Sequence, residues 1–400
     1  MRRPRELIGV SVLVLAAFGV GLVVGPLRSD DDDPPAGTEA ADRPGPVSTT
    51  QPVTVSSVPG PEQEQVVADD PEVGTRDGSP LDDLPEHITT LTDFGQRPDW
   101  SPDGRHIVFL DASPLGDIWT VDVETKEARN VTADLGDQQY SRAYYLSNGD
   151  LLLCGPTSGP KPTAEHPEAG RFTGVMSILR APFDQPPQAL GPSCWEGMAT
   201  SRRSMRIAWN RSDIDYTDSD LVDRVVNGIT EIWTGEIRFV DDRPVIVDVR
   251  KVLDRDSFGS FAVFEVQGFR PPAEDELILT AYAYQSGEVI GLDTATGALR
   301  NYSNSSAYEE AEGVDDTGGA VYVERDLEYS GIDPGALDIW RLSLTDGRWE
   351  RMTFFNRYAP FYASNPTVSP DGARLAFQLS INGETEGQGD GILLYDLSTA

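Results

Sequence analysis

Clustered carboxylates are the first group of side chains in this sequence that could do chemistry. Asp213, Asp215, Asp218 and Asp220 lie within eight residues, and hard oxygen ligands at alternate positions can bind calcium. The spacing differs from that of a helix-loop-helix calcium loop, because the sixth position is Asp218 instead of glycine and the twelfth is Arg224 instead of glutamate. The pattern favours a solvated acidic insertion, with calcium as the alternative, and no other metal site or cofactor is predicted.

Nucleophilic catalysis has no sequence signature here. No Gly-x-Ser-x-Gly motif occurs, and the three histidines are His87, His106 and His166. None of them has the partner spacing of a catalytic triad or of a zinc site. We therefore predict no catalytic residue from motifs.

The N-terminal residues 1–28 have the composition of a membrane anchor. An apolar run from Leu7 to Leu27 follows three arginines and precedes a run of aspartates at residues 30–33. About twenty apolar residues in a helix span roughly the 30 Å of a bilayer core, and the charge asymmetry places the N-terminus in the cytoplasm. We expect a single-pass protein with the rest of the chain outside the membrane; the alternative is a cleaved signal peptide and a secreted protein.

Residues 29–86 are predicted to be a disordered, acidic tether, since they are rich in Pro, Ser and Thr and have few large apolar side chains. The formal net charge of the whole chain is −34. A polyanion cannot bind nucleic acid by neutralising phosphates, so that class of partner is disfavoured.

A repeated sequence indicates the strands that would position any functional site. Residues 101–109 and 369–377 both begin Ser-Pro-Asp-Gly and continue as an alternating strand. Proline presets the second position of a type I turn, and glycine accepts the left-handed conformation that follows. Four weaker copies lie between them, which gives six units at about 95–132, 133–192, 193–253, 254–303, 304–355 and 356–400.

Six such units predict an all-β, six-bladed propeller of four-stranded antiparallel blades over residues 87–400. The last unit lacks a fourth strand, whereas residues 88–92 resemble the fourth strand at residues 128–132. We therefore expect residues 87–92 to complete the last blade and close the ring.

The stretch from Pro98 to Phe109 reads Pro-x-Trp-Ser-Pro-Asp-Gly-x-x-Ile-x-Phe, which resembles the repeat of TolB-like (WD-repeat-like) propellers. The resemblance implies an exported propeller that engages other proteins, and it carries over no catalytic residue. The same resemblance puts Cys154 on an inner strand and Cys194 at the entry to the next blade. A disulfide between them and two buried free thiols both remain open.

A propeller's funnel is lined by the loops that enter its innermost strands, and aromatic, arginine and carboxylate side chains there could bind a peptide or a sugar. The alternative is that these side chains fill the gaps between blades. In this register the loops offer Arg97, Trp100, Tyr140, Arg142, Trp195, Glu196, Phe264, Glu265, Tyr308, Glu309, Tyr362 and Asn365.

Two functions fit the sequence. The first is a non-catalytic, monomeric binding module held outside the cell membrane, which engages a protein or a cell-envelope ligand at the funnel. The second is a propeller enzyme, such as a glycosidase or a lactonase, that uses channel carboxylates or a divalent metal. A carboxylate pair within about 5–10 Å, or a tightly bound metal, would favour the second.

Overall fold

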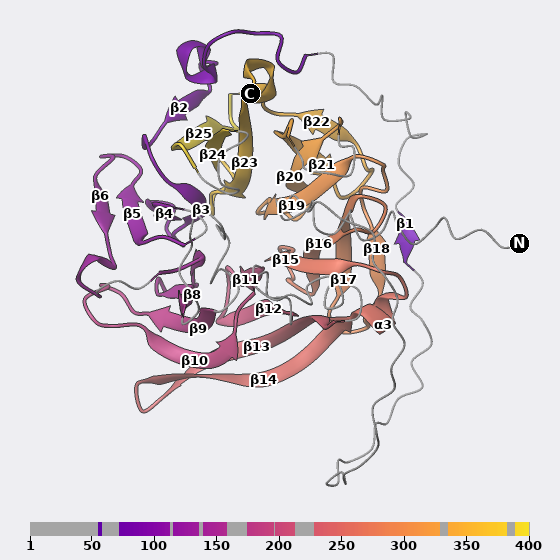
Figure 1. Cartoon of the computed structure of the whole chain (residues 1–400). Helices are drawn as coiled ribbons and strands as arrows, with labels where there is room; N and C mark the ends of the chain where they lie inside the picture. Colours follow the sequence, from indigo (N-terminus) through magenta and orange to yellow (C-terminus); the bar gives the residue numbers. More distant parts are fainter. Residues whose placement is uncertain are drawn as a thin grey trace, which may run out of the picture.

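The computed structural model describes residues 55–57, 72–112, 115–135, 139–157, 174–195, 197–212, 228–328, 335–381 and 389–399. Within these ranges six antiparallel sheets stand around a central axis as the blades of a propeller (Figure 1). Five of the sheets have four strands, and the fourth blade has a fifth strand on its outer edge. The predicted all-β, six-bladed architecture is confirmed.

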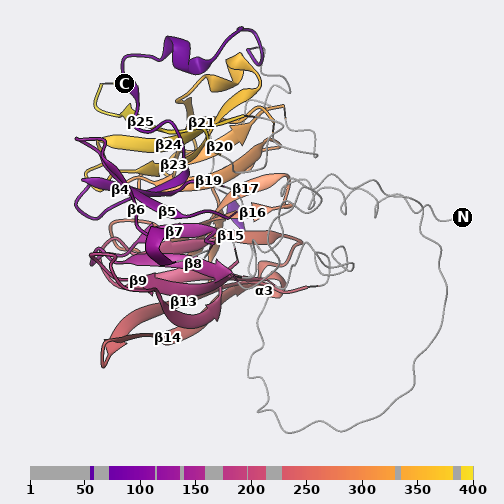
Figure 2. The ribbon, with the colours of Figure 1, turned by 60° about the vertical axis from the view of Figure 1, so that its left-hand side comes forward.

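Each blade begins with its innermost strand, which lies nearest the centre of the ring in Figure 1; Figure 2 gives a turned view of the same sheets. Blades one to three contain β3 (Gln96–Trp100), β4 (His106–Leu110), β5 (Ile118–Asp122) and β6 (Ala128–Asn130); β7 (Arg142–Tyr145), β8 (Leu151–Thr157), β9 (Gly174–Leu179) and β10 (Gln188–Ser193); and β11 (Met198–Thr200), β12 (Arg206–Ser212), β13 (Thr230–Val240) and β14 (Arg243–Asp254). Blades four to six contain β15 (Val263–Phe269), β16 (Glu276–Tyr282), β17 (Gly287–Asp293), β18 (Leu299–Asn301) and β1 (Ser56–Ser57); β19 (Tyr308–Val314), β20 (Ala320–Asp326), β21 (Asp338–Ser343) and β22 (Trp349–Arg351); and β23 (Phe361–Val368), β24 (Arg374–Ile381), β25 (Ile392–Asp396) and β2 (Ile88–Thr90). Short helical turns include η1 (Pro80–Asp83), η2 (Ala133–Leu135), α3 (Arg255–Phe258) and η3 (Phe355–Tyr358).

The repeated Ser-Pro-Asp-Gly turns owe their shape to the serine and the aspartate. In the first blade the Ser101 hydroxyl donates to Asp103 Oδ1 at 2.6 Å and accepts from the His106 N–H at 2.9 Å. Ser369 donates to Asp371 in the same way in the last blade. The hydroxyl contact lowers the pKa of both aspartates. These residues hold the turn between the first two strands of a blade.

The ring closes through the N-terminal strand. β2 pairs antiparallel with β25, so the sixth blade takes its outer strand from the other end of the propeller sequence. Thr92 follows β2, and its hydroxyl accepts from the Ile392 N–H at 3.1 Å. Thr132 follows β6 and accepts from the Ile118 N–H at 3.0 Å in the first blade. The N-terminal segment therefore supplies the sixth blade with both its outer strand and this hydroxyl.

Four pairs of neighbouring blades are joined by a hydrogen bond at one repeated position, the fifth residue of the second strand as counted from its turn. Asn210 Oδ1 accepts from the Val266 N–H at 2.8 Å, and Gln378 Oε1 accepts from the Arg97 N–H at 2.7 Å. In each case a side chain of one blade satisfies a backbone donor on the inner strand of the next blade. Across the six blades this position holds Leu110, Cys154, Asn210, Thr280, Glu324 and Gln378.

In the second blade the same position carries a covalent link. Cys154 forms a disulfide with Cys194, which lies just before β11, with 5.6 Å between their Cα atoms. Both sulfur-bearing residues are buried. Of the two states that the sequence left open, the structure has the disulfide.

Part of the segment expected to be a disordered tether is folded onto the propeller. The Gly74 N–H donates to the Asn356 carbonyl at 3.0 Å, and Arg76 Nη1 donates to the Tyr358 hydroxyl at 2.9 Å. The Arg357 guanidinium binds the Glu72 carboxylate. Backbone pairing and these ion pairs hold residues 72–86, which low hydrophobicity alone did not predict.

Several predicted features lie outside the described residues, namely the anchor at residues 1–28, Glu196, and Asp213, Asp215, Asp218 and Asp220. In the part of the chain that is described, no helix is long and apolar enough to span a bilayer. Nor do these ranges hold a group of three or more His, Cys, Asp or Glu side chains arranged to bind a metal ion.

Removing the Thr92 hydroxyl should weaken ring closure. Thr92→Val leaves the buried Ile392 N–H without its acceptor, so we expect the free energy of unfolding to fall by about 1–3 kcal/mol in denaturant titrations. Thr89→Val, at an exposed position of the same strand, is the matched control and should change stability little. Equal stability of the two variants would contradict this account of closure.

Breaking the disulfide should destabilise the second and third blades. The bridge closes a loop between residues 40 apart, and loops of this size typically stabilise a fold by about 2–4 kcal/mol. Cys154→Ala/Cys194→Ala should therefore lower the thermal midpoint measured by circular dichroism. A reductant should lower the midpoint of the wild type and leave that of the double variant unchanged.

Candidate functional site

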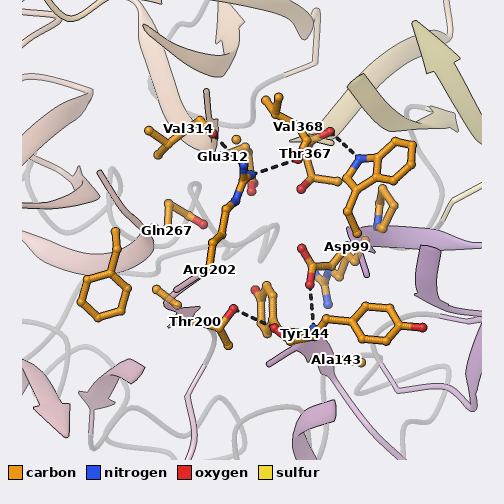
Figure 3. Close-up of a pocket in the computed structure, with 18 of the residues that line it drawn as sticks. Asp99, Ala143, Tyr144, Thr200, Arg202, Gln267, Glu312, Val314, Thr367 and Val368 are labelled. Atoms are coloured by element: carbon orange, nitrogen blue, oxygen red, sulfur yellow. Dashed lines mark hydrogen bonds between the residues drawn. The ribbon is translucent and has the colours of Figure 1, made fainter. Parts of the chain in front are cut away.

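All six inner strands line one pocket on the propeller axis. It lies toward the turns that connect the first and second strands, and its cavity volume is about 140 Å³. Figure 3 shows Asp99, Arg202, Gln267 and Glu312 directed into this space from different blades. The pocket is therefore a shared product of the ring, and no single blade could form it.

Irregular pairing turns polar side chains toward the axis. In four blades the ladder between the first and second strands shifts register, at residues 96–99, 266–268, 311–313 and 364–367. A bulge of this kind re-aims the side chain of the extra residue. The residues within the four shifts include Arg97, Gln267, Glu312 and Asn365, all of which line the pocket.

Two of these bulges share a strained backbone. Arg97 and Asn365 have φ angles of 53° and 50°, in the left-handed region, and each precedes a proline. Their N–H groups are bonded to Gln378 and to Glu324, which lie on the second strand of the preceding blade. The links between blades therefore also stabilise the bulges that shape the channel.

Four glutamates form an acidic cluster between blades four and five, comprising Glu265, Glu310, Glu312 and Glu324. Glu265 and Glu312 line the pocket directly, and Glu310 is the strand partner of Glu324. Glu265 and Glu324 are each only 3% exposed. The Glu312 carboxylate has no hydrogen-bond partner among the described residues.

One tyrosine hydroxyl joins two members of the acidic cluster. Tyr282 Oη lies 2.6 Å from Glu265 Oε2 and 2.5 Å from Glu310 Oε1. The Tyr308 hydroxyl also donates to Glu310, at 2.5 Å. A hydroxyl has a single hydrogen to donate, so the second short contact of Tyr282 requires a proton held on a carboxyl group. Tyr282 therefore holds Glu265 of blade four and Glu310 of blade five close to each other.

Burial governs the protonation of the other two members. It raises the pKa of Glu312 well above its ordinary value, and the Glu324 carboxylate adds to the rise. Burial and the Glu310 carboxylate likewise raise the pKa of Glu324, against the effect of two hydrogen bonds from Asn365. Desolvation and repulsion between like charges thus favour the neutral acids over the carboxylates.

Arg142 is a cation beside this cluster, and a glycine of the third blade lies close to the glutamate that Arg142 approaches. Arg142 of the second blade reaches Glu265 of the fourth blade, with 3.6 Å between Nη2 and Oε1. The intervening inner strand has Gly197 at this level, where a Cβ atom would lie 2.7 Å from Glu265 Cγ. A Cβ atom there would also lie 2.5 Å from Asn210 Oδ1 and 2.7 Å from the Val266 nitrogen, so a larger residue would disturb the bond between these blades as well as the glutamate.

At the turn end of the pocket, Arg202 extends across the axis. Its Nη2 donates to the carbonyls of Val368 at 2.9 Å and Val314 at 3.5 Å, in blades six and five. Desolvation lowers the pKa of Arg202. Asp99 accepts from the Tyr145 N–H at 2.7 Å, and burial raises the pKa of Asp99 to about 6 despite that bond and the nearby Arg202 charge. Arg202 therefore links blades three, five and six at this end of the pocket, although the residue as a whole is exposed.

The structure separates the funnel residues predicted from sequence into two groups. Those that line the pocket are Arg97, Trp100, Arg142, Glu265 and Asn365. Those that lie away from it are Tyr140, Trp195, Phe264, Tyr308, Glu309 and Tyr362. All of the second group except Tyr362 are buried, as the gap-filling alternative expects. Glu309, for example, is fully buried and binds Arg325 at 3.0 Å.

Sequence reasoning missed several residues of the pocket. Gln267 and Glu312 lie in bulges, which strict alternation does not reveal, and Arg202 occupies a turn whose Pro-Asp pair has been replaced. A pair of arginines at the place of Pro-Asp is the one signal that could have drawn attention to this turn. The missed residues are Asp99, Tyr144, Arg202, Gln267, Tyr282, Glu310, Glu312 and Glu324.

Asp99 should give the protein a measurable pH dependence. Its pKa is about 6 in the folded protein against an ordinary 3.8, so the folded state binds the proton more tightly. The free energy of unfolding should therefore fall as pH rises from about 4 to about 6. Asp99→Asn should make that decline shallower, by on the order of 3 kcal/mol over the window.

The control for this titration is Asp103→Asn. The pKa of Asp103 is lowered, so this residue titrates below the window and its loss should leave the decline between pH 4 and 6 unchanged. An identical pH slope in Asp99→Asn and wild type would show that Asp99 does not titrate as the structure indicates.

Comparison with known proteins yields likeness of fold alone. No protein family and no curated protein matches the sequence. Among solved structures, TolB from Acinetobacter baumannii is 12% identical with a TM-score of 0.45, over 76% of this chain and 64% of that one, so the chain spans less than two thirds of its length. The gluconolactonase XC5397 from Xanthomonas campestris is 13% identical with a TM-score of 0.49, and the match covers 86% of this chain and 98% of that one. An oligogalacturonate lyase in complex with manganese is 12% identical with a TM-score of 0.44, and the match covers 78% of this chain and 93% of that one. The chain therefore has distant structural similarity to TolB and to other propellers.

Proposed function

We propose that this protein is a non-catalytic binding module whose axial pocket receives a positively charged group of a protein or cell-envelope ligand. The observation that carries the proposal is the acidic cluster, in which Glu265 and Glu312 face the pocket and Glu312 has no hydrogen bond to a described residue. Four carboxyl groups converge there, with Arg142 as the neighbouring cation. An ammonium or guanidinium group would form a charge-assisted hydrogen bond with the ionised Glu312 carboxylate.

Proton linkage gives this proposal a distinctive consequence. Burial raises the pKa values of Glu312 and Glu324 well above the ordinary value, which favours their protonated forms in the unliganded protein. A bound cation stabilises the ionised carboxylates and lowers these pKa values. Binding should therefore release protons, and the affinity should rise with pH.

The cellular setting of the proposal is outside the cytoplasm, at the membrane. The disulfide between Cys154 and Cys194 supports an oxidising compartment. The apolar run from Leu7 to Leu27, with arginines before it and aspartates after it, supports an anchor whose tether leads to the propeller. A propeller presented in this way would meet envelope proteins or cell-wall ligands.

Site-specific photo-cross-linking in the native cells tests the proposal. A photoreactive residue at Gln267, inside the pocket, should capture a partner, whereas the same residue at Val249, exposed on β14, should not capture it. Glu312→Gln in the Gln267 background should lower the yield at least several-fold, and the wild-type yield should increase from pH 6 to pH 8. Capture that is equal at both positions, or unaffected by Glu312→Gln, would remove the support for a pocket ligand.

A second candidate function follows from the Tyr282 bridge. Glu265 and Glu310 contact the same hydroxyl, so their nearest oxygens lie within the sum of two hydrogen-bond lengths. One protonated and one ionised carboxyl at close range is the arrangement of a glycosidase acid and its partner. The test is turnover of a panel of glycosides and lactones, with Glu310→Gln as the inactive control. No turnover, or equal turnover by both proteins, would end this candidate.

A further inference from the structure

The outer edge of the fourth blade is covered by a strand from far away in the sequence. β1 (Ser56–Ser57) pairs in parallel with β18, with Ser56 opposite Arg300 and Ser57 opposite Asn301. The Ser56 hydroxyl donates to the Leu299 carbonyl at 3.2 Å. Val55 packs against the apolar cluster that contains Leu299 and Phe258. In Figure 1 this short strand lies beside β18 at the rim, well away from β2.

This edge differs from the corresponding edges of the first and fifth blades. In β18, Leu299 and Asn301 are buried and Arg300 is exposed, whereas every residue of β6 and β22 is at least partly exposed. An unpaired outer strand leaves N–H and C=O groups available to a further strand, and buried apolar contacts add to that pairing. Blade four therefore has both the backbone edge and the apolar support for a docked segment.

We propose that the segment at Val55–Ser57 is a detachable strap, and that the outer edge of blade four is its dedicated docking site. The strap ties the N-terminal segment to one chosen blade, some way before the chain reaches the ring at residue 72. A pairing of two residues is short enough to open and close without disturbing β18, which stays paired to β17. When the strap is docked, blade four is the part of the propeller nearest to the N-terminal segment.

The strap also sets a length, if the tether proposed above is correct. With the strap open, a free tether from about residue 28 to residue 72, where the chain meets the propeller, has roughly 44 residues and a coil dimension on the order of 35 Å. Docking at residue 55 leaves roughly 27 residues and a dimension on the order of 30 Å. Docking of the strap therefore brings the propeller closer to the point where the tether is attached, with blade four facing that point.

Disulfide trapping in the full-length protein tests the docking directly. Ser56→Cys/Arg300→Cys joins residues that face each other in the parallel pair. Ser56→Cys/Arg129→Cys is the matched control, because Arg129 is the middle residue of β6 as Arg300 is of β18. Under mild oxidation we expect the first pair to cross-link within a molecule and the second pair to remain reduced. Equal cross-linking of the two pairs, or none in the first, would overturn the proposal.

Hydrogen exchange gives a second and independent readout. Ser56→Pro/Ser57→Pro removes both strap N–H groups, so the amides of a peptide covering residues 298–303 should exchange several-fold faster than in wild type. Thr49→Pro/Thr50→Pro, which leaves the strap sequence intact, should not change them. Unchanged exchange in the strap variant would show that the edge is not occupied. Neither measurement involves the pocket, so failure here leaves the proposed pocket ligand unaffected.

Discussion

The structure depends on a contact between blades that recurs at one position of the second strand. Asn210, Thr280, Glu324 and Gln378 each accept a hydrogen bond from a backbone N–H on the inner strand of the following blade. Hydrophobic packing between blades has no direction, whereas these bonds fix how far along the axis one blade lies against the next. In the second blade Cys154 achieves the same end covalently. These contacts therefore fix the position of each blade they join relative to the next, in addition to the packing between blades.

That registration explains why the pocket can hold so many poorly compensated charges. The bonds to Arg97 and Asn365 secure inner-strand bulges, and the bulges direct polar side chains to the axis. Buried carboxyl groups with raised pKa values work against stability near neutral pH, as Glu312 and Glu324 do. A rigid frame tolerates this strain because it cannot relax by letting one blade slide. Strained and poorly compensated groups of this kind are typical of binding or catalytic sites.

The fold could be predicted because its signals are local. The turn at Ser101–Gly104 carries its own chemistry, and its second copy in the last blade revealed the period of the repeat. The residues of the pocket were harder to predict from the sequence, because a bulge reverses which side of a strand a residue faces. Glu309 was selected on loop position and is fully buried beside Arg325, whereas its neighbour Glu310 joins the acidic cluster. Arg202 was missed because its role depends on carbonyl groups more than a hundred residues away. Neither the face on which Glu310 lies nor the partners of Arg202 can be read from residue spacing along the chain.

The closing strand ties the order of synthesis to the order of folding. β2 is among the first parts of the propeller to be made, yet its partner β25 lies about 300 residues later, as the bond between Thr92 and Ile392 shows. Contacts so distant in sequence form slowly, because the intervening chain must first be brought together. The ring therefore cannot close on a partly made chain. Until β25 has been made, the last blade lacks its partner for β2, so completion of the chain is the event that permits closure.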